Sequence, residues 1–209
     1  MRTESFLIVG AGGHAKVVID ALRSLHGIDC LLQLADDDVK FAGLFSMGLP
    51  IVLPVAKAMQ PGGYFHVAIG NNSFRSQVAD FCLQAGMKYR SVLHSRAMVA
   101  ASAEVGIGCF VAAGAILAPE SFLGVGCIVN HGAVIDHDCR LGAFCHVAPN
   151  ATLGGGVAVG DGVLIGAGAN VLPGVSIGEG CVVGAGAVVL HNLPAGGTYV
   201  GVPAQCLQG

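Results

Sequence analysis

Side chains able to carry out acid–base chemistry are concentrated in one short stretch of this chain. Residues 129 to 146 include Asn130, His131, Asp136, His137, Asp138, Arg140 and His146. A histidine ring has a pKa near working pH, so it can act as a general base. A carboxylate bonded to one ring nitrogen fixes the tautomer and strengthens the other nitrogen as a base. We therefore expect His137 to be a base assisted by Asp138. This requires a bend in the backbone, since adjacent residues of an extended strand point to opposite faces.

A second group of candidate residues surrounds a glycine-rich turn near the start of the chain. An apolar run, residues 5–9, ends in Gly10-Ala-Gly-Gly-His14, and residues 16–25 then have helical spacing. A strand, a glycine turn and a helix can hold phosphate on backbone N–H groups at the helix start. A further strand, 30–35, ends in three aspartates at 36–38, where an acid would meet a ribose or a base. Alternatively, the turn is a tight connection without a ligand and the acids are a solvated loop.

The polar stretch lies within a six-residue repeat. Every sixth residue is Val, Ile or Leu over sixteen consecutive repeats: Val99, Val105, Val111, Leu117, Leu123, Val129, Ile135, Leu141, Val147, Leu153, Val159, Ile165, Val171, Ile177, Val183 and Val189. A period of six is typical of a parallel β-helix built from hexapeptides, in which three hexads make one coil. The aliphatic side chains point inward, and Gly, Asn and Asp occupy the corners, where turn backbone angles are needed. The repeat predicts about five coils.

The remainder of the first ninety or so residues predicts a small α/β domain. Short strands are expected at 50–53 and 66–70, and a connecting strand at 89–93. A helix is expected over 73–85, with Ser73 as its cap and Val78, Phe81, Cys82 and Ala85 on one face. The sheet would contain three or four parallel strands. We therefore divide the chain into a Rossmann-like domain, 1–93, and a β-helix domain, 94–209, with the boundary at the change of period.

Composition narrows the possible functions. The net charge of −3 argues against a nucleic-acid partner. The long uncharged stretch after residue 180 is too rich in Gly and Pro to be a spanning helix, and the N-terminus does not resemble a signal peptide, so we expect a cytoplasmic protein. Five of the eight cysteines, Cys109, Cys127, Cys139, Cys145 and Cys181, occupy the small inward position of the repeat, where free thiols act as small hydrophobes. A zinc site near residues 137–146 is a less favoured interpretation of these cysteines and histidines, and we expect no metal.

These motifs together resemble those of the bacterial hexapeptide-repeat acyltransferases that acetylate nucleotide-linked amino sugars, grouped with sialic-acid O-acetyltransferase-like proteins. The resemblance covers nearly the whole chain and includes the glycine turn, Asp36-Asp37, Ala68-Ile-Gly-Asn71, Val92-Leu-His94, residues 130–146 and Gly201-Val-Pro-Ala204. It implies a left-handed β-helix and a homotrimer with active sites between subunits. It also implies the site residues: Gly12, Gly13, His14, Asp36 and Asp37 for the nucleotide sugar; His137 and Asp138 for catalysis; and His146, with backbone groups near Ala167 and Ala185, for acetyl-CoA. The polar stretch itself adds Asn130 as a substrate-binding candidate.

The chain departs from the family pattern beside the base and after the terminal motif. The family often carries Glu beside the base, where this chain has the shorter Asp138, and Lys after the terminal motif, where this chain has Gln205. Arg140 is the only Lys or Arg between Ala97 and Gly209. The coenzyme phosphates would therefore rely on backbone N–H groups, on solvent or on the first domain of a neighbouring subunit.

The leading interpretation is acetyl-CoA-dependent N-acetylation of a nucleotide-linked 4-amino sugar for surface-glycan or glycoprotein synthesis. The amine would attack the thioester carbonyl directly while His137 removes its proton, and an N–H group would stabilise the oxyanion. Two alternatives stay open: O-acetylation of a sugar such as sialic acid, and a non-catalytic nucleotide-sensing trimer. A dinucleotide-dependent oxidoreductase is disfavoured, because ninety residues leave little room for a full six-stranded fold. The sugar and the choice between UDP and GDP are left open.

Overall fold

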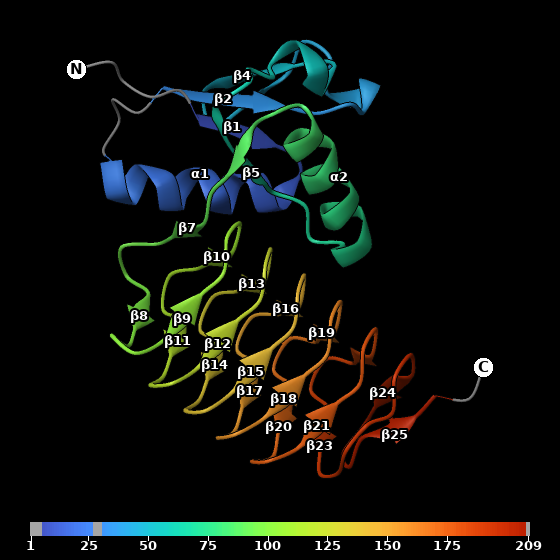
Figure 1. Cartoon of the computed structure of the whole chain (residues 1–209). Helices are drawn as coiled ribbons and strands as arrows, with labels where there is room; N and C mark the ends of the chain where they lie inside the picture. The colour runs from blue at the N-terminus through green and yellow to red at the C-terminus, as the bar shows by residue number, and fades with distance from the viewer. Residues whose placement is uncertain (1–5, 27–30, 208–209) are drawn as a thin grey trace. The chain divides into compact units, whose positions relative to one another are not determined.

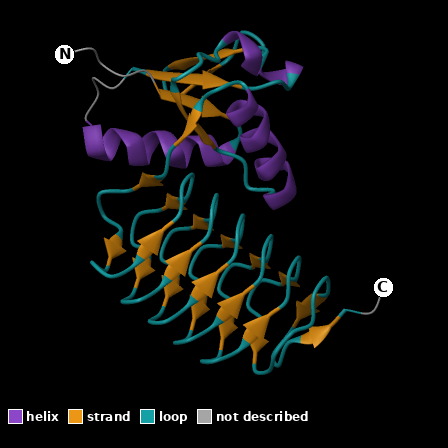
Figure 2. Ribbon diagram, viewed as in Figure 1, coloured by secondary structure: helices purple, strands orange, loops and turns teal. Residues whose placement is uncertain are grey.

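The computed structural model describes residues 6–26 and 31–207. Its contacts divide the chain into two compact units, with the boundary between Ser95 and Arg96. The first unit is mixed α/β and the second consists of short strands joined by turns (Figures 1 and 2). In the part of the chain that the structure describes, no helix combines the length and the hydrophobicity needed to cross a membrane.

The first unit is built on a six-stranded sheet of order β3-β4-β2-β1-β5-β6. Its strands are β1 (Phe6–Val9), β2 (Leu32–Ala35), β3 (Phe45–Ser46), β4 (Leu49–Val52), β5 (Tyr64–Val67) and β6 (Lys88–Tyr89). All neighbours are parallel except β3 and β4. The expected three or four strands were too few, because β3 and β6 have only two residues each and no recognisable alternation. Cys30, expected in the second strand, lies outside the described residues.

Helix α1 (Gly13–His26) follows the glycine turn directly, as the apolar spacing predicts. It buries Val18, Ile19 and Leu22 in the core of the first unit. Two 3₁₀ helices, η1 (Val39–Phe41) and η2 (Val55–Lys57), occupy connections. The expected strand over 89–93 is divided into β6 and β7 (Val92–Leu93), with Arg90 and Ser91 outside both strands.

Helix α2 (Asn72–Gln84) differs from the prediction at its cap and at its buried face. The cap is Asn71, whose Oδ1 accepts the N–H of Phe74 at 2.9 Å, and not Ser73. The buried residues of the helix are Arg75, Ala79 and Cys82. Phe81, expected on the same face as Cys82, is 49% exposed. An apolar stripe along a helix does not by itself distinguish a core face from the wall of a cavity, and here it forms such a wall, as shown below.

The second unit is a parallel β-helix, which confirms the prediction from the six-residue period. Strands eighteen residues apart pair in register, Val111 with Val129 and Val129 with Val147, so each coil has three sides. Each of the three faces is a stack of parallel strands, drawn from green to red in Figure 1.

The faces follow one another along the chain, and we number them in this way. The first face contains β10 (Phe110–Val111), β13 (Ile128–Val129), β16 (His146–Val147), β19 (Leu164–Ile165), β22 (Val182–Val183) and β24 (Thr198–Val200), with the antiparallel β25 (Gln205–Cys206). The second contains β8 (Met98–Val99), β11 (Ile116–Leu117), β14 (Val134–Ile135), β17 (Thr152–Leu153), β20 (Asn170–Val171) and β23 (Val188–Val189). The third contains β9 (Glu104–Val105), β12 (Phe122–Leu123), β15 (Arg140–Leu141), β18 (Ala158–Val159) and β21 (Ser176–Ile177).

Aliphatic residues and free cysteines fill the interior of the coils. Leu123, Leu141 and Val147 are each at most 1% exposed. Five cysteines are buried and free, as expected: Cys109, Cys127, Cys139, Cys145 and Cys181. Each thiol also donates a hydrogen bond to a backbone carbonyl of a following turn; that of Cys127 lies 3.0 Å from the oxygen of Gly142. The small inward position therefore contributes both packing and a partner for a backbone oxygen.

Candidate active site

His137 and Asp138 lie in the turn between β14 and β15, at the corner where the second face meets the third. Asp138 has a φ of 60°, in the left-handed region that Asp enters more readily than most residues. This conformation brings its side chain to the ring of its neighbour: Nδ1 of His137 lies 2.7 Å from Oδ2 of Asp138. The backbone N–H of His137 donates to Oδ1 of Asp136 at 2.7 Å. The turn thus meets the geometric condition for a carboxylate-assisted base.

The electrostatics of this turn favour a more basic ring. The hydrogen bond that the His137 ring donates to Asp138 raises the pKa of His137 above its ordinary value, and the negative charge of Asp136 adds to the effect. With Nδ1–H donating to Asp138, Nε2 carries the lone pair. The side chain of His137 is 61% exposed, so a substrate can reach it.

Asn130 and His146 form a second polar pair, with His146 on the first face of the β-helix and Asn130 at the corner where that face meets the second. They belong to adjacent coils, since Ile128 of β13 pairs with His146 of β16. Nδ2 of Asn130 lies 3.3 Å from Nε2 of His146, and Oδ1 of Asn130 accepts the N–H of His131 at 2.9 Å. Asn130 is thereby held at both ends of its amide, and it in turn orients the ring of His146.

His137 and His146 lie on opposite sides of one β-helix. The corner between the second and third faces is opposite the first face, and the buried core lies between them. A single chain therefore does not bring His137 and His146 together. Ala167 and Ala185 are exposed in successive coils at the corner between the first and second faces, the corner at which Asn130 also lies; the N–H of Gly186 donates to the oxygen of Ala167 at 2.8 Å. The predicted site residues of the second unit thus form two groups: His137 and Asp138 at one corner, and Asn130, His146, Ala167 and Ala185 on the first face and its corner with the second.

The predicted residues of the first unit meet at one cavity of about 470 Å³. Gly12, Gly13, His14, Asp36 and Asp37 all line it. Both oxygens of Asp36 accept backbone N–H groups: Oδ2 that of Ala11 at 2.7 Å and Oδ1 that of Asp38 at 2.9 Å. Asp36 therefore holds the glycine turn in place. Asp37 accepts the N–H of Val55 through Oδ1.

The opposite wall of this cavity was not predicted from the sequence. Phe74, Val78 and Phe81 of α2 line it, and the two phenylalanines are 54% and 49% exposed. Their helical spacing is visible in the sequence but equally fits a buried stripe.

A buried arginine shapes the loop beside this wall. Arg75 is 1% exposed, and its guanidinium donates at 3.1 Å to the oxygens of Ile69 and Gly70, both of which line the cavity. Arg75 therefore fixes part of the cavity wall from behind. The sequence carries no clear signal for this role, because an arginine on a helix is usually solvated.

Comparison with known proteins relates both units to enzymes. Residues 5–81 match the PglD N-terminal domain, and residues 156–191 match the bacterial transferase hexapeptide (six repeats). A histidine-to-alanine variant of GDP-perosamine N-acetyltransferase from Caulobacter crescentus, solved with CoA and GDP-perosamine, is 37% identical with a TM-score of 0.90. That match covers 98% of this chain and 97% of the relative. This chain belongs to the hexapeptide-repeat sugar N-acetyltransferases.

Two further similar proteins support this family assignment. The acetyltransferase domain of PglB from Neisseria gonorrhoeae is 35% identical with a TM-score of 0.90, and the match covers 98% of this chain and all of that domain. The same domain has been solved in complex with acetyl coenzyme A. UDP-N-acetylbacillosamine N-acetyltransferase of Bacillus subtilis is 35% identical over 108 residues, which is about half of this chain and half of that protein.

Proposed function

We propose that this chain transfers the acetyl group of acetyl-CoA to the amino group of a nucleotide-linked amino sugar. The observation that carries the proposal is the 2.7 Å contact between His137 and Asp138 on an exposed corner of the β-helix. A carboxylate-assisted histidine suits the removal of a proton from an attacking amine. The relatives named above are N-acetyltransferases, which favours an amine over a hydroxyl as the attacking group.

The reaction proceeds by direct attack. The neutral amine forms a C–N bond to the thioester carbonyl, and Nε2 of His137 takes a proton from the nitrogen. The C–S bond then breaks, and the thiolate of CoA leaves and takes up the proton that His137 carries. Asp138 stabilises the imidazolium that exists between these steps. No covalent enzyme intermediate is needed, because the thioester is already activated and placement supplies much of the rate.

The cavity of the first unit would hold the nucleotide. Backbone N–H groups at the start of α1, around Gly12 and Gly13, suit a diphosphate. The carboxylate of Asp37 suits a hydroxyl donor of the ribose or an N–H donor of the base. The rings of Phe74 and Phe81 offer an apolar wall for the base. Asp36 contributes by fixing the turn, through its bond to Ala11.

We propose a homotrimer with its active sites between subunits. His137 and His146 lie on opposite sides of one β-helix, so a site that uses both needs residues from two chains. His146, oriented by Asn130, would contact acetyl-CoA together with backbone groups at Ala167 and Ala185. Because acetyl-CoA and nucleotide sugars are made in the cytoplasm, the reaction would take place there.

The experiment is release of free CoA thiol from acetyl-CoA with a panel of acceptors: UDP- and GDP-linked 4-amino sugars, and free sialic acid. We expect release with one nucleotide-linked amino sugar and its loss in His137→Ala. Release with sialic acid alone would replace the proposal by O-acetylation. Nucleotide binding without any thiol release would favour the sensing trimer.

A further inference from the structure

We propose that Gly155 is a positioning residue for His137, because the missing side chain at residue 155 leaves the space in which the imidazole lies. The placement of the ring is a property of the fold. Its consequence for catalysis rests on the function proposed above.

The contact is between two successive coils. Gly155 follows β17 in the same turn position that His137 has after β14, eighteen residues earlier. A Cβ built on Gly155 would lie 2.5 Å from Cε1, 2.6 Å from Nε2 and 3.2 Å from Nδ1 of His137. Carbon atoms in contact are normally about 3.5–4.0 Å apart. The ring therefore packs against the backbone of Gly155 in space that any other residue would occupy.

The backbone does not require a glycine at this position. The φ of Gly155 is outside the left-handed region, whereas that of the next residue, Gly156, is +71°. The same turn position is Pro119 one coil before His137 and Pro173 one coil after Gly155, so the β-helix accommodates side chains here. The glycine at 155 is accounted for by the ring that packs on it.

This packing limits the orientations that the ring can adopt. His137 is 61% exposed, and two contacts hold its ring: the bond from Nδ1 to Asp138 at one edge and the backbone of Gly155. An added methyl group would push the ring away, and the Nδ1–Oδ2 bond would lengthen or break. Nε2 would then no longer point where the attacking amine is held.

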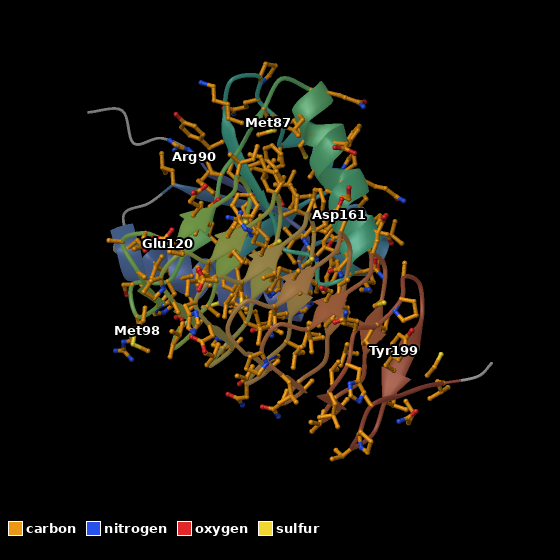
Figure 3. The ribbon with its side chains drawn as sticks, turned by 60° about the horizontal axis from the view of Figure 1, so that its bottom comes forward. Met87, Arg90, Met98, Glu120, Asp161 and Tyr199 are labelled. Carbon is orange, nitrogen blue, oxygen red and sulfur yellow. The ribbon has the colours of Figure 1, made fainter. Side chains whose placement is uncertain are left out.

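The ionisable groups around the ring define the expected titration. Asp136 and Asp138 lie in its own turn, Arg140 follows on β15, and Glu120 lies in the turn of the preceding coil, where Figure 3 labels it. The turn of the following coil, 154–156, consists of three glycines and has no ionisable group. Because the bond to Asp138 is the largest cause of the raised pKa of His137, a displaced ring should titrate at a lower pH.

The test is Gly155→Ala, with Pro173→Ala as the matched control, since both place alanine at the same turn position of successive coils. We expect Gly155→Ala to lower kcat by roughly 10- to 100-fold, the effect of a misplacement of about 1 Å, with KM for the nucleotide sugar little changed. Histidine NMR titration, assigned with His137→Ala, should show a lower pKa for His137 in Gly155→Ala and an unchanged one in Pro173→Ala.

A second measurement covers the case in which the variant is unstable. If the cost of the new methyl group is a clash with the ring, Gly155→Ala should destabilise a chain that already carries His137→Ala less than it destabilises the wild type. An unchanged kcat and titration in Gly155→Ala would overturn the proposal, as would equal destabilisation in both backgrounds. A wild-type chain without transferase activity would instead overturn the proposed function and leave the titration and stability tests of Gly155 valid.

Discussion

Nδ1 of His137 lies 2.7 Å from Oδ2 of Asp138, although the two residues are neighbours in the chain. In a regular strand their side chains would point to opposite faces. The left-handed backbone of Asp138, with a φ of 60°, turns its carboxylate back to the ring. Glycines occupy the corresponding position in the next two coils, Gly156 and Gly174, with φ of 71° and 73°. The left-handed corner that pairs His137 with Asp138 is therefore a repeated feature of the β-helix.

Removal of the ring of His137 should lower kcat by roughly 10²- to 10⁴-fold, the usual contribution of a general base. The fold should be retained, because the side chain is exposed. The measurement is thiol release under saturating substrates for His137→Ala. The matched control is His191→Ala, another exposed histidine of the β-helix. Near-normal turnover of His137→Ala would exclude it as the base.

Replacement of Asp138 by Asn should shift the acid limb of the pH–rate profile. Asn tolerates the left-handed backbone, so the turn should persist. The carboxylate raises the pKa of His137, and the base is active only when neutral. In the variant the ring titrates at a lower pH, so the acid limb moves to lower pH while kcat at high pH falls roughly tenfold, since a weaker base removes the proton more slowly. An acid limb at the same pH in both proteins would show that Asp138 does not act on the ring.

Mixed oligomers should recover activity from two inactive chains. If each site takes His137 from one subunit and His146 from another, a trimer containing both His137→Ala and His146→Ala chains has one intact site. Random mixing in equal amounts should give roughly a quarter of wild-type activity for a cyclic trimer. The experiment is denaturation and refolding of the mixture, with each variant refolded alone as the control. No recovery, with mixed trimers demonstrated by mass, would argue against shared sites.

The buried cysteines at the small inward position of the repeat should contribute to stability and not to catalysis. The thiol of Cys127 is fully buried and donates to the oxygen of Gly142 at 3.0 Å. Cys127→Ala leaves a small cavity and an unpaired carbonyl, so the free energy of unfolding should fall by about 1–3 kcal/mol. Cys206→Ala, at an exposed cysteine, is the control. Denaturant unfolding measures both, and equal stabilities would contradict a structural role for the thiol.

The buried His66 should make the first unit sensitive to acid. Burial lowers the pKa of His66 to about 4, with Arg75 adding to the effect, while the hydrogen bond between its Nδ1 and the oxygen of Arg90 opposes it. The unfolded chain, with a pKa near 6.5, therefore binds the proton first as the pH falls. Stability should decrease from pH 6.5 to pH 4, by roughly 3 kcal/mol in total from this group.

His66→Gln retains a donor for Arg90 but does not titrate, so its stability should depend less on pH over the same range. Urea unfolding at pH 7 and pH 4.5 measures the difference between the two proteins. Parallel pH dependences would show that other groups dominate acid unfolding.

The fold and part of the site could be predicted from the sequence because they depend on local patterns. The six-residue period specifies which side chains face inward, and this held from Val111 to Val189. It was wrong at Val99, which is 37% exposed in the first coil. The adjacency of His137 and Asp138 and the glycine turn with the acids that follow β2 are likewise readable from spacing. Of the helix face predicted from Val78, Phe81 and Cys82, only Cys82 is buried in the core, whereas Val78 and Phe81 line the cavity. Periodicity gives the face of a helix and not what lies opposite it.

The sequence by itself determined the β-helix, its inward residues and the presence of a histidine–carboxylate pair, because each follows from residues close together in the chain. Only the tertiary structure decided which residues meet across coils and across the sheet. It placed the ring of His137 on Gly155, Asn130 beside His146, and Arg75 behind the wall of the cavity. It also separated His137 from His146, which are nine residues apart in the chain, because each coil turns three corners and directs successive sides away from one another.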